Sequence, residues 1–384
     1  MSNTLTPVIP TIFAMGVKAL RENCVMPRLI NSSYSTDAEK KGNVVNIPIP
    51  SAVSVADVTP AAYAPNAGGS TPDVAQISLD YWREAAFDMT DKDLSIAVQG
   101  VVPGQVSEAI RSLSNDINSK IFALYKGFYG YAGSAGTTPF SVDLSEATAV
   151  RKALNKQLAP LDSRYLVIDP DAEAKALDRR AIQDASYRNS AEGIREGTIG
   201  RTLGFDWYMD QTVPTHTAGT ITTGLAAKSA TAQTVGDKTI VCTTAASTGA
   251  CALLAGDIVT FGTDPQTYVL TAAATQASAN SDVTLNIEPG LKIALAGSEA
   301  VAVKSTHVAN LAFHRDAIGF ASRLLQDSYF NASDREKVMS MADPVSGLTL
   351  RLEVGREYKR TRWSFDILYG CGIVRREFGA RLAG

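Results

Sequence analysis

A run of alternating side chains, Gln76–Thr90, constrains this sequence more than any other stretch. Its odd positions are mostly apolar and its even positions mostly polar, and Arg83, Trp82 and Ala86 are the exceptions. A period of two predicts a β-strand with one buried face and one solvated face. Fifteen residues of strand would span roughly 50 Å, whereas a typical strand has about 5–6 residues. Such an arm is unusual in a soluble enzyme and typical of a protein that reaches over its neighbours.

A second alternating stretch, Val44–Ile49, precedes this run. Pro48 and Pro50 cannot donate to a strand ladder, which predicts an edge strand. The intervening Ser51–Pro72 is rich in Ala, Pro, Gly and Ser. The two strands together predict an extended hairpin with a loose tip. Because a lone hairpin is only marginally stable in water, we expect it to need a partner surface, most simply a neighbouring copy of the chain.

Two helices are predicted in the first third of the chain. A short apolar stripe from Ile9 to Leu20 predicts an N-terminal helix that Pro27 ends, and this helix docks either on its own subunit or on another. The longer helix begins near Pro103 and runs to Gly127, about 24 residues or roughly 36 Å. Its apolar stripe is Val106, Ile110, Leu113, Ile117, Ile121, Leu124 and Phe128. The opposite face, which includes Asn118, is predicted to be solvated.

Mixed helices and strands follow. We predict a helix over Ser145–Leu158 with Asp143 as its N-cap, a buried strand at Tyr165–Ile168, and a helix over Asp171–Ala185. The stretch Gly193–Thr212 is predicted to be a loop followed by a strand.

The composition then changes. No arginine occurs between Arg201 and Arg315, and Thr, Ala, Gly and Ser dominate Thr215–Thr306. Short β-prone runs separated by turn signals predict a small inserted β-barrel or sandwich. These runs are Thr239–Cys242, Ile258–Phe261, Thr267–Leu270, Val283–Ile287 and Ala300–Val303.

Long alternation returns near the C-terminus, over Leu348–Val354 and Trp363–Tyr369. Between Arg351 and Gly384 there are eight basic residues and four acidic ones. A solvated or salt-bridged sheet face is the favoured interpretation of these charges, and contact with a neighbouring subunit is the alternative.

Composition and motifs argue against several classes of function. A net charge of -3 and a pI of about 5.7 are unlike those of a protein whose main task is to hold nucleic acid. Phosphate-binding loops, dinucleotide fingerprints, nucleophile elbows and metal-ligand spacings are missing from the sequence. We therefore predict no catalytic, cofactor-binding or metal site, and no enzyme. The start of the chain lacks the features of a signal peptide, Thr239–Gly256 is too polar for a membrane span, and four cysteines without paired spacing fit a reducing cytoplasm.

Several loose motifs, taken in their order and spacing, resemble one family. They are Arg195–Arg201, Gly204–Asp206, Asn310–Leu325, Ile367–Gly370 and Tyr165–Pro170. With the arm, the long hairpin, the long helix and the β-rich insertion, the chain resembles the major capsid (coat) proteins of tailed bacteriophages. Within them it is most similar to the podovirus coat subfamily of the Hong Kong-type fold, which carries an inserted β-barrel.

This resemblance implies an α+β fold in seven segments. They are an N-terminal arm (1–36), an extended loop (37–90), a peripheral domain with a spine helix (91–140), an axial domain in two parts (141–214 and 307–345), an inserted β-barrel (215–306), and C-terminal strands that return to the peripheral or axial region (346–384). It also implies contacts between subunits, which we expect at Phe13, Tyr63, Tyr81, Trp82, Arg83, Asp237, Asp257, Arg356, Arg360 and Arg362.

As function, the resemblance implies self-assembly as hexamers and pentamers into an icosahedral head around double-stranded DNA. The implied partners are other copies of the chain, a scaffolding protein during assembly, a portal protein at one vertex, and the packaged DNA without sequence specificity. The implied location is the virion capsid, assembled in the cytoplasm of a host bacterium, without membrane contact. An encapsulin-like cellular nanocompartment is the alternative, and the β insertion argues for the virus. Covalent cross-linking in some relatives needs a lysine on the extended loop, and Ala52–Thr71 has none.

Overall fold

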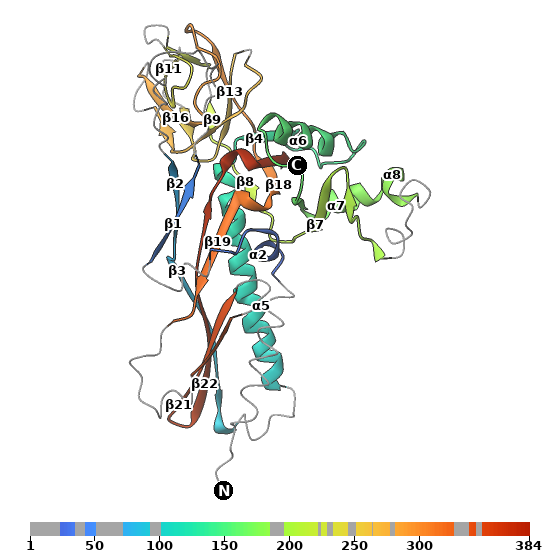
Figure 1. Ribbon diagram of the computed structural model, residues 1–384, viewed down its shortest axis with the longest axis vertical. Coiled ribbons are helices and arrows are strands. Elements are labelled where there is room, and N and C mark those ends of the chain that lie inside the picture. The colour runs from blue at the N-terminus through green and yellow to red at the C-terminus, as the bar shows by residue number, and fades with distance from the viewer. Residues whose placement is uncertain are drawn as a thin grey trace, which may run out of the picture. The chain divides into compact units, whose positions relative to one another are not determined.

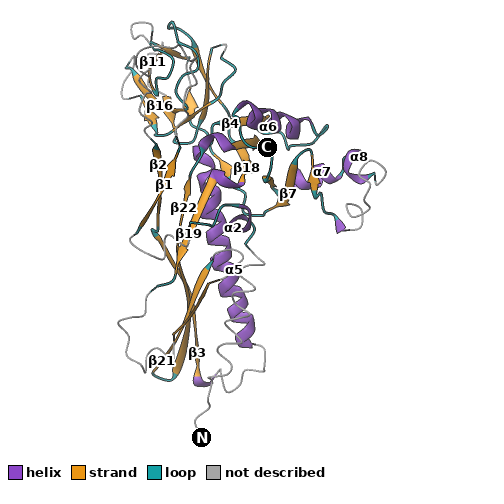
Figure 2. Cartoon of the chain, viewed as in Figure 1, coloured by secondary structure: helices purple, strands orange, loops and turns teal. Residues whose placement is uncertain are grey.

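The computed structural model describes residues 24–34, 43–50, 72–92, 101–184, 196–221, 224–228, 233–244, 251–262, 264–276, 281–325, 338–342 and 348–384. These residues form a mixed α+β fold (Figures 1 and 2). They divide into two compact units, one within 32–110 and 318–374 and the other within 22–31, 111–317 and 375–384.

The first unit is built on an antiparallel sheet around one long strand, β22 (Arg360–Ile373). One edge of β22 pairs with β3 (Tyr81–Thr90), and the other pairs with β21 (Thr349–Glu357) and β19 (Ile318–Arg323). A fifth strand, β20 (Val338–Ala342), pairs with β21. The alternation predicted for the C-terminal stretch is confirmed over residues 360–365, whereas residues 365–370 of β22 are all buried.

The predicted single strand over Gln76–Thr90 is wrong, because the chain breaks there into β2 (Asp73–Ser78) and β3. β2 pairs with β1 (Val44–Ile49), whereas β3 pairs with β22. The break comes where the chain crosses Gly370 of β22, since a Cβ on that glycine would lie 2.2 Å from the carbonyl oxygen of Ser78. Alternation continues through the break and therefore hides it.

The β1–β2 hairpin buries its apolar side within its own unit. Val45, Ile47, Ile77 and Leu79 pack together with Ala321 of β19. The expectation that this hairpin needs a neighbouring copy to cover it is therefore wrong for these strands. The tip between them, and the N-terminal helix expected before residue 24, lie outside the described residues.

The predicted long helix is confirmed as α5 (Val101–Phe122), which a 3-10 turn, η1 (Ala123–Gly127), extends (Figure 2). Its stripe from Val106 to Ile121 is buried, as the spacing predicts. Asn118 is a correction: it was expected on the solvated face, but it is buried and its Nδ2 donates to Asp210 Oδ2 at 3.1 Å. A short helix, α2 (Met26–Leu29), has Pro27 in its first turn, so this proline begins a helix here.

The second unit contains a sheet in the order β4-β23-β18-β5-β7-β6, with β8 paired to β18. The strands are β4 (Gly130–Gly133), β5 (Arg164–Ile168), β6 (Arg201–Thr202), β7 (Phe205–Met209), β8 (Thr215–His216), β18 (His307–His314) and β23 (Gly379–Ala383). Helix α6 (Ser145–Lys156) packs against β4 and β23 (Figure 1). Asp143 Oδ1 accepts from the amide of Ser145 at 2.8 Å, at the start of α6.

The helix predicted over Asp171–Ala185 is instead two short helices, α7 (Pro170–Leu177) and α8 (Arg180–Gln183). Asp178 and Arg179 separate them. Two further 3-10 turns, η2 (Arg315–Ala317) and η3 (Arg376–Phe378), lead out of β18 and into β23. β18 and β19 belong to different sheets, so the chain passes from one unit to the other after Ala317.

The predicted insertion is confirmed as a closed six-stranded barrel in the order β10-β11-β16-β14-β13-β17. Its strands are β10 (Leu225–Ala227), β11 (Thr239–Thr244), β13 (Ile258–Phe261), β14 (Tyr268–Leu270), β16 (Val283–Glu288) and β17 (Ala300–Val303). A small sheet of β9 (Thr220–Ile221), β12 (Cys251–Leu253) and β15 (Ala274–Thr275) accompanies it. The barrel has its own apolar core, which includes Ile240, Phe261 and Leu285.

Candidate functional site

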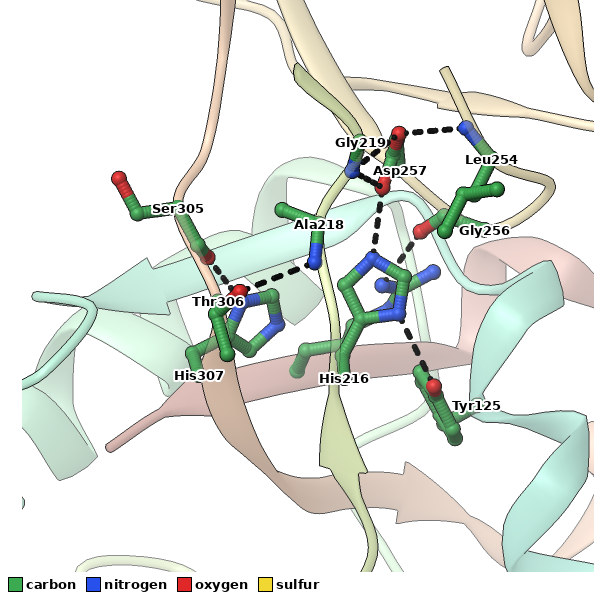
Figure 3. A network of polar contacts seen from close by, with 11 residues as sticks. Tyr125, His216, Ala218, Gly219, Leu254, Gly256, Asp257, Ser305, Thr306 and His307 are labelled. Carbon is green, nitrogen blue, oxygen red and sulfur yellow. Dashed lines mark hydrogen bonds and ion pairs between the residues drawn. The ribbon is translucent and has the colours of Figure 1, made fainter. Parts of the chain in front are cut away.

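A buried polar cluster joins the inserted barrel to the sheet of the second unit (Figure 3). We call it the polar junction and define it by Tyr125, His216, Gly219, Leu254 and Asp257. Tyr125 comes from η1 and His216 from β8, and Asp257 precedes barrel strand β13. Hydrogen bonds thereby connect η1 and β8 to the barrel at the residue that precedes β13.

Asp257 is the acceptor at the centre of the junction. It is fully buried, and its carboxylate accepts from His216 Nε2 at 2.9 Å, from the Leu254 amide at 2.8 Å and from the Gly219 amide at 3.0 Å. Gly219 is required here, because a Cβ would lie 2.6 Å from Asp257 Oδ2 and 2.4 Å from the carbonyl oxygen of Ala252. The structure therefore places Asp257 inside its own subunit, which corrects the expectation that its side chain contacts a neighbour.

His216 bridges Asp257 and Tyr125, which lie on opposite sides of its ring in Figure 3. A carboxylate only accepts, so Nε2 donates to Asp257, and Nδ1 lies 2.9 Å from the Tyr125 hydroxyl oxygen, within hydrogen-bond distance. Burial is the main cause that raises the pKa of Tyr125, so the phenol keeps its proton. Tyr125, His216 and Asp257 therefore all have hydrogen-bond partners within the junction.

Arg381 and His307 flank the junction. Arg381 is fully buried, its Nη1 donates to the Gly256 carbonyl at 2.7 Å, and its guanidinium lies 5.0 Å from the Tyr125 ring centroid. Burial lowers the pKa of Arg381 to about 10, and the nearby Asp257 carboxylate opposes that shift. His307 contacts the His216 ring at 5.2 Å between centroids, and burial, then Arg381 and His216, lower its pKa to about 4.

These residues form a structural attachment and not a catalytic centre. A tyrosine–histidine–aspartate chain could move a proton, but the side chains of His216 and Asp257 are 3% and 0% exposed, so a substrate cannot reach them. Among the residues that the structure describes, no group of histidine, cysteine or acidic side chains could hold a metal ion. Within the same described ranges, no helix is both long and apolar enough to cross a bilayer.

Few features of the sequence predict this junction. Arg381 was counted with the basic residues of a solvated sheet face, and it is instead buried within β23. The available signal was a lone charge inside the apolar stretch Gly379–Ala383. Tyr125 and His216 had no comparable signal, because their partners are 91 and 41 residues away in sequence.

The basic residues expected at subunit contacts on β21 and β22 form ion pairs within their own sheet. Arg362 pairs with Glu84 at 2.9 Å and Arg360 with Asp88 at 3.3 Å, both on β3. Arg356 pairs with Asp91 at 2.9 Å, just after β3. Arg360 also pairs with Glu357. The salt-bridged sheet face, which was the favoured interpretation, is confirmed for these three arginines, and their contacts with other copies stay a prediction.

The aromatic residues expected at subunit contacts lie at the start of β3. Tyr81 packs on Tyr369 with ring centroids 5.3 Å apart, and Arg83 lies 5.9 Å from the Tyr81 ring. Trp82 is 63% exposed, and its Nε1 donates to Asp366 Oδ2 at 2.9 Å.

The remaining expected contact residues fall in two groups. Asp237 belongs to a barrel turn, where its Oδ2 accepts from the Thr234 amide at 2.6 Å and from the Thr234 hydroxyl at 3.1 Å. Phe13 and Tyr63 lie outside the described residues.

Comparison with known proteins identifies the architecture. No protein-family model matches the sequence, and no curated protein matches it. A chain in the solved structure of Mycobacterium phage Che8 is similar over 94% of this chain and 90% of that chain, with a TM-score of 0.54 and 16% identity. A chain in the capsid structure of cyanophage P-SCSP1u is similar over 94% and 88%, with a TM-score of 0.53 and 12% identity. This chain has the fold of a phage capsid protein.

Identities this low establish the fold and leave function to be argued from the molecule. The expected α+β capsid fold with an inserted small β-barrel agrees with the observed architecture, in which the barrel has six strands. Within that capsid fold, the polar junction is a buried, hydrogen-bonded connection between the barrel and the sheet into which the barrel is inserted.

Proposed function

We propose that this chain is the major capsid protein of a tailed, double-stranded DNA bacteriophage. It assembles as hexamers and pentamers into an icosahedral head that encloses the genome. The observation that carries this proposal is the similarity of fold over 94% of the chain to a chain of the cyanophage P-SCSP1u capsid. Because the similarity covers nearly all of both chains, it concerns the whole subunit and not one shared domain.

The charge of the chain is consistent with a capsid protein that does not bind the packaged DNA tightly. The net charge is -3, and Arg356, Arg360 and Arg362 are engaged by acidic residues of the same sheet. Packaged DNA would therefore meet a surface without a strong net attraction. The proposed partners are other copies of the chain, a scaffolding protein, a portal protein at one vertex and DNA held without sequence specificity. The proposed location is the virion, after assembly in the cytoplasm of the host bacterium.

The exposed part of β3 supports contacts between copies. Trp82 is held by its hydrogen bond to Asp366 while 63% of its surface is exposed. A large, oriented and uncovered aromatic side chain is a common anchor of protein interfaces. We therefore keep Tyr81, Trp82 and Arg83 as proposed contact residues, and Arg356, Arg360 and Arg362 beside them.

The direct test is expression of the full chain with and without the scaffolding protein of the same virus. Hollow particles of uniform size in negative-stain images are the expected result. Particles that contain host enzymes instead of DNA would favour the encapsulin-like alternative. Monomers alone, with scaffolding protein present, would contradict the proposed function.

A further inference from the structure

The turn that follows α6 presents two leucines to solvent. Leu158 is 86% exposed and Leu161 is 65% exposed. We call residues 158–161, with the sequence Leu-Ala-Pro-Leu, the α6 turn. Apolar side chains that stand out together at a tight turn contribute nothing to the core beneath them.

The backbone of this turn also has a conformation that is unusual for leucine. The Leu158 amide donates to the Asn155 carbonyl at 3.2 Å, and the Ala159 amide donates to the Leu154 carbonyl at 3.1 Å. This is the Schellman end of a helix, whose left-handed position is normally glycine. Here that position is Leu158, with φ of +60°. A leucine that is both strained and exposed brings no gain to the isolated subunit, which points to a role outside it.

A buried arginine holds the α6 turn in place. Arg164 is 1% exposed, and it donates from Nε to the Pro160 carbonyl at 2.6 Å and from Nη2 to the Ala159 carbonyl at 2.7 Å. Its Nη1 donates to Asn155 Oδ1 at 2.8 Å. Two charge-assisted hydrogen bonds hold the turn itself and the third ties Arg164 to helix α6, so the turn is rigid and little conformational entropy is lost when it binds.

The same unit contains a pocket of suitable character. It has a volume of about 490 Å³ and is lined by Ile168, Ile199, Trp207 and Met209, with Glu173 and Glu196 also in its wall. Met209 and Tyr208 are each 36% exposed and form the accessible apolar wall, whereas Ile168, Ile199 and Trp207 are buried beneath it. A pocket of this size can accept two aliphatic side chains.

The α6 turn and the pocket lie at opposite ends of β5. The turn precedes Arg164, the first residue of the strand, and the pocket reaches β5 only at Ile168, the last residue. The turn of one copy therefore cannot fill the pocket of the same copy. A contact between two different patches of identical chains is head-to-tail, and it closes into a ring when the rotation allows.

Most charges around the two patches are complementary, and the exception at the turn is Asp162, which is 80% exposed beside Leu161. Lys156, two residues before Leu158, is exposed, and Lys152 is exposed one turn earlier. The pocket wall carries Glu173 and Glu196, besides an Arg201–Asp206 pair separated by 3.8 Å. Docking would place lysines beside carboxylates, which orients the approach of the two copies.

We propose that the α6 turn of one copy docks in this pocket of the next copy, as a head-to-tail contact within a ring of subunits. The proposal rests on the proposed capsid function and deepens it, because it names the surfaces that join neighbours in a capsomer.

The first test is a cross-link between copies. Leu158→Cys and Met209→Cys are made in separate full-length chains that also carry Cys371→Ser, because the other three cysteines are buried. One chain is isotope-labelled, the two are mixed, assembled with the scaffolding protein and oxidised, and the linked peptides are identified by mass spectrometry. Disulfides between positions 158 and 209 are expected. Assembled particles that contain only 158–158 links, or none, would overturn the contact.

The second test compares substitutions at two highly exposed positions. Leu158→Asp is expected to raise the protein concentration needed for assembly at least about tenfold, without a change in the far-UV circular dichroism of the monomer. Val142→Asp is the matched control, because Val142 is 79% exposed in the same unit and lies outside both patches. Equal assembly of both variants would refute the contact while leaving the capsid function intact. A wild type that never assembles would refute both proposals.

Discussion

Arg351 and Asp366 face each other across β21 and β22 and form a bidentate pair, with Nε to Oδ1 at 2.9 Å and Nη2 to Oδ2 at 2.5 Å. Both side chains are largely buried. Asp366 Oδ2 also accepts from the Trp82 indole at 2.9 Å, so one carboxylate ties together β3, β22 and β21. The exposed ion pairs farther along the same strands lack this burial.

Removal of the Asp366 carboxylate should therefore destabilise the first unit strongly. Asp366→Ala removes the bidentate partner of the largely buried Arg351 guanidinium, and we expect a loss of about 3–5 kcal/mol in the free energy of unfolding. Asp88→Asn is the control, because it disrupts only an exposed pair, and its denaturation midpoint should stay close to that of the wild type. Urea denaturation of the full chain measures both. Similar midpoints for the two variants would contradict the role given to Asp366.

The glycine where β2 crosses β22 should be intolerant of a side chain. A methyl group at Gly370 would lie 2.2 Å from the Ser78 carbonyl oxygen, so Gly370→Ala should cost roughly 1–3 kcal/mol as the strands move apart. Gly355→Ala in β21 is the matched control, because no atom lies within 4 Å of its added methyl group. Thermal unfolding should separate the two variants, and an unchanged melting temperature for Gly370→Ala would contradict the close approach.

Neutralising the Asp257 carboxylate should destabilise the polar junction. Asp257→Asn puts an amide, which is itself partly a donor, against three N–H groups, and we expect a loss of about 3 kcal/mol. Limited proteolysis should then cut within residues 215–306 faster than in the wild type. Asp237→Asn, at a barrel turn, serves as the control. If Asp257→Asn had a normal stability and only impaired assembly, a contact with another subunit would be the better explanation.

Stability should fall with acid because of His307. Its pKa is about 4 in the fold against an ordinary 6.5, so between these values the unfolded chain binds a proton that the folded chain does not. Stability from this group is therefore full above pH 6.5 and declines as the pH falls toward 4, by about 3 kcal/mol in total. His307→Gln should flatten this part of the profile. Parallel pH profiles for the variant and the wild type would show that His307 is not responsible.

Leu158→Gly should have opposite effects on the subunit and on its assembly. Glycine relieves the left-handed backbone at Leu158, so the isolated subunit should gain up to about 1 kcal/mol. The docking leucine is lost at the same time, so assembly should require more protein. Calorimetry of the monomer and light scattering during assembly measure the two effects. A destabilised monomer would contradict the strain assigned to this position.

Local patterns predicted much of this fold. The barrel strand Ile258–Phe261 was expected with the bounds that the structure gives, because turn residues mark both of its ends. The apolar stripe of α5 was equally informative, because a period near 3.6 belongs to the helix itself.

The misses share a physical cause, since each depends on a partner distant in sequence. Alternation through Gln76–Thr90 shows which side chains are buried, but not that β2 pairs with β1 while β3 pairs with β22. Asn118 looked solvent-facing because Asp210, its partner, follows 92 residues later. Arg381 was expected on the surface because of its charge. In the interior, however, it donates a hydrogen bond to the Gly256 carbonyl and packs over the Tyr125 ring. Tertiary contacts of this kind override local preference.

The proposed capsid function is tested most directly by a cryo-EM reconstruction of particles assembled from this chain with its scaffolding protein. The expected result is a closed icosahedral shell of hexamers and pentamers, with the α6 turn of each copy in the pocket of the next. A reconstruction without a closed shell, or a preparation that contains only monomers under the same conditions, would contradict it.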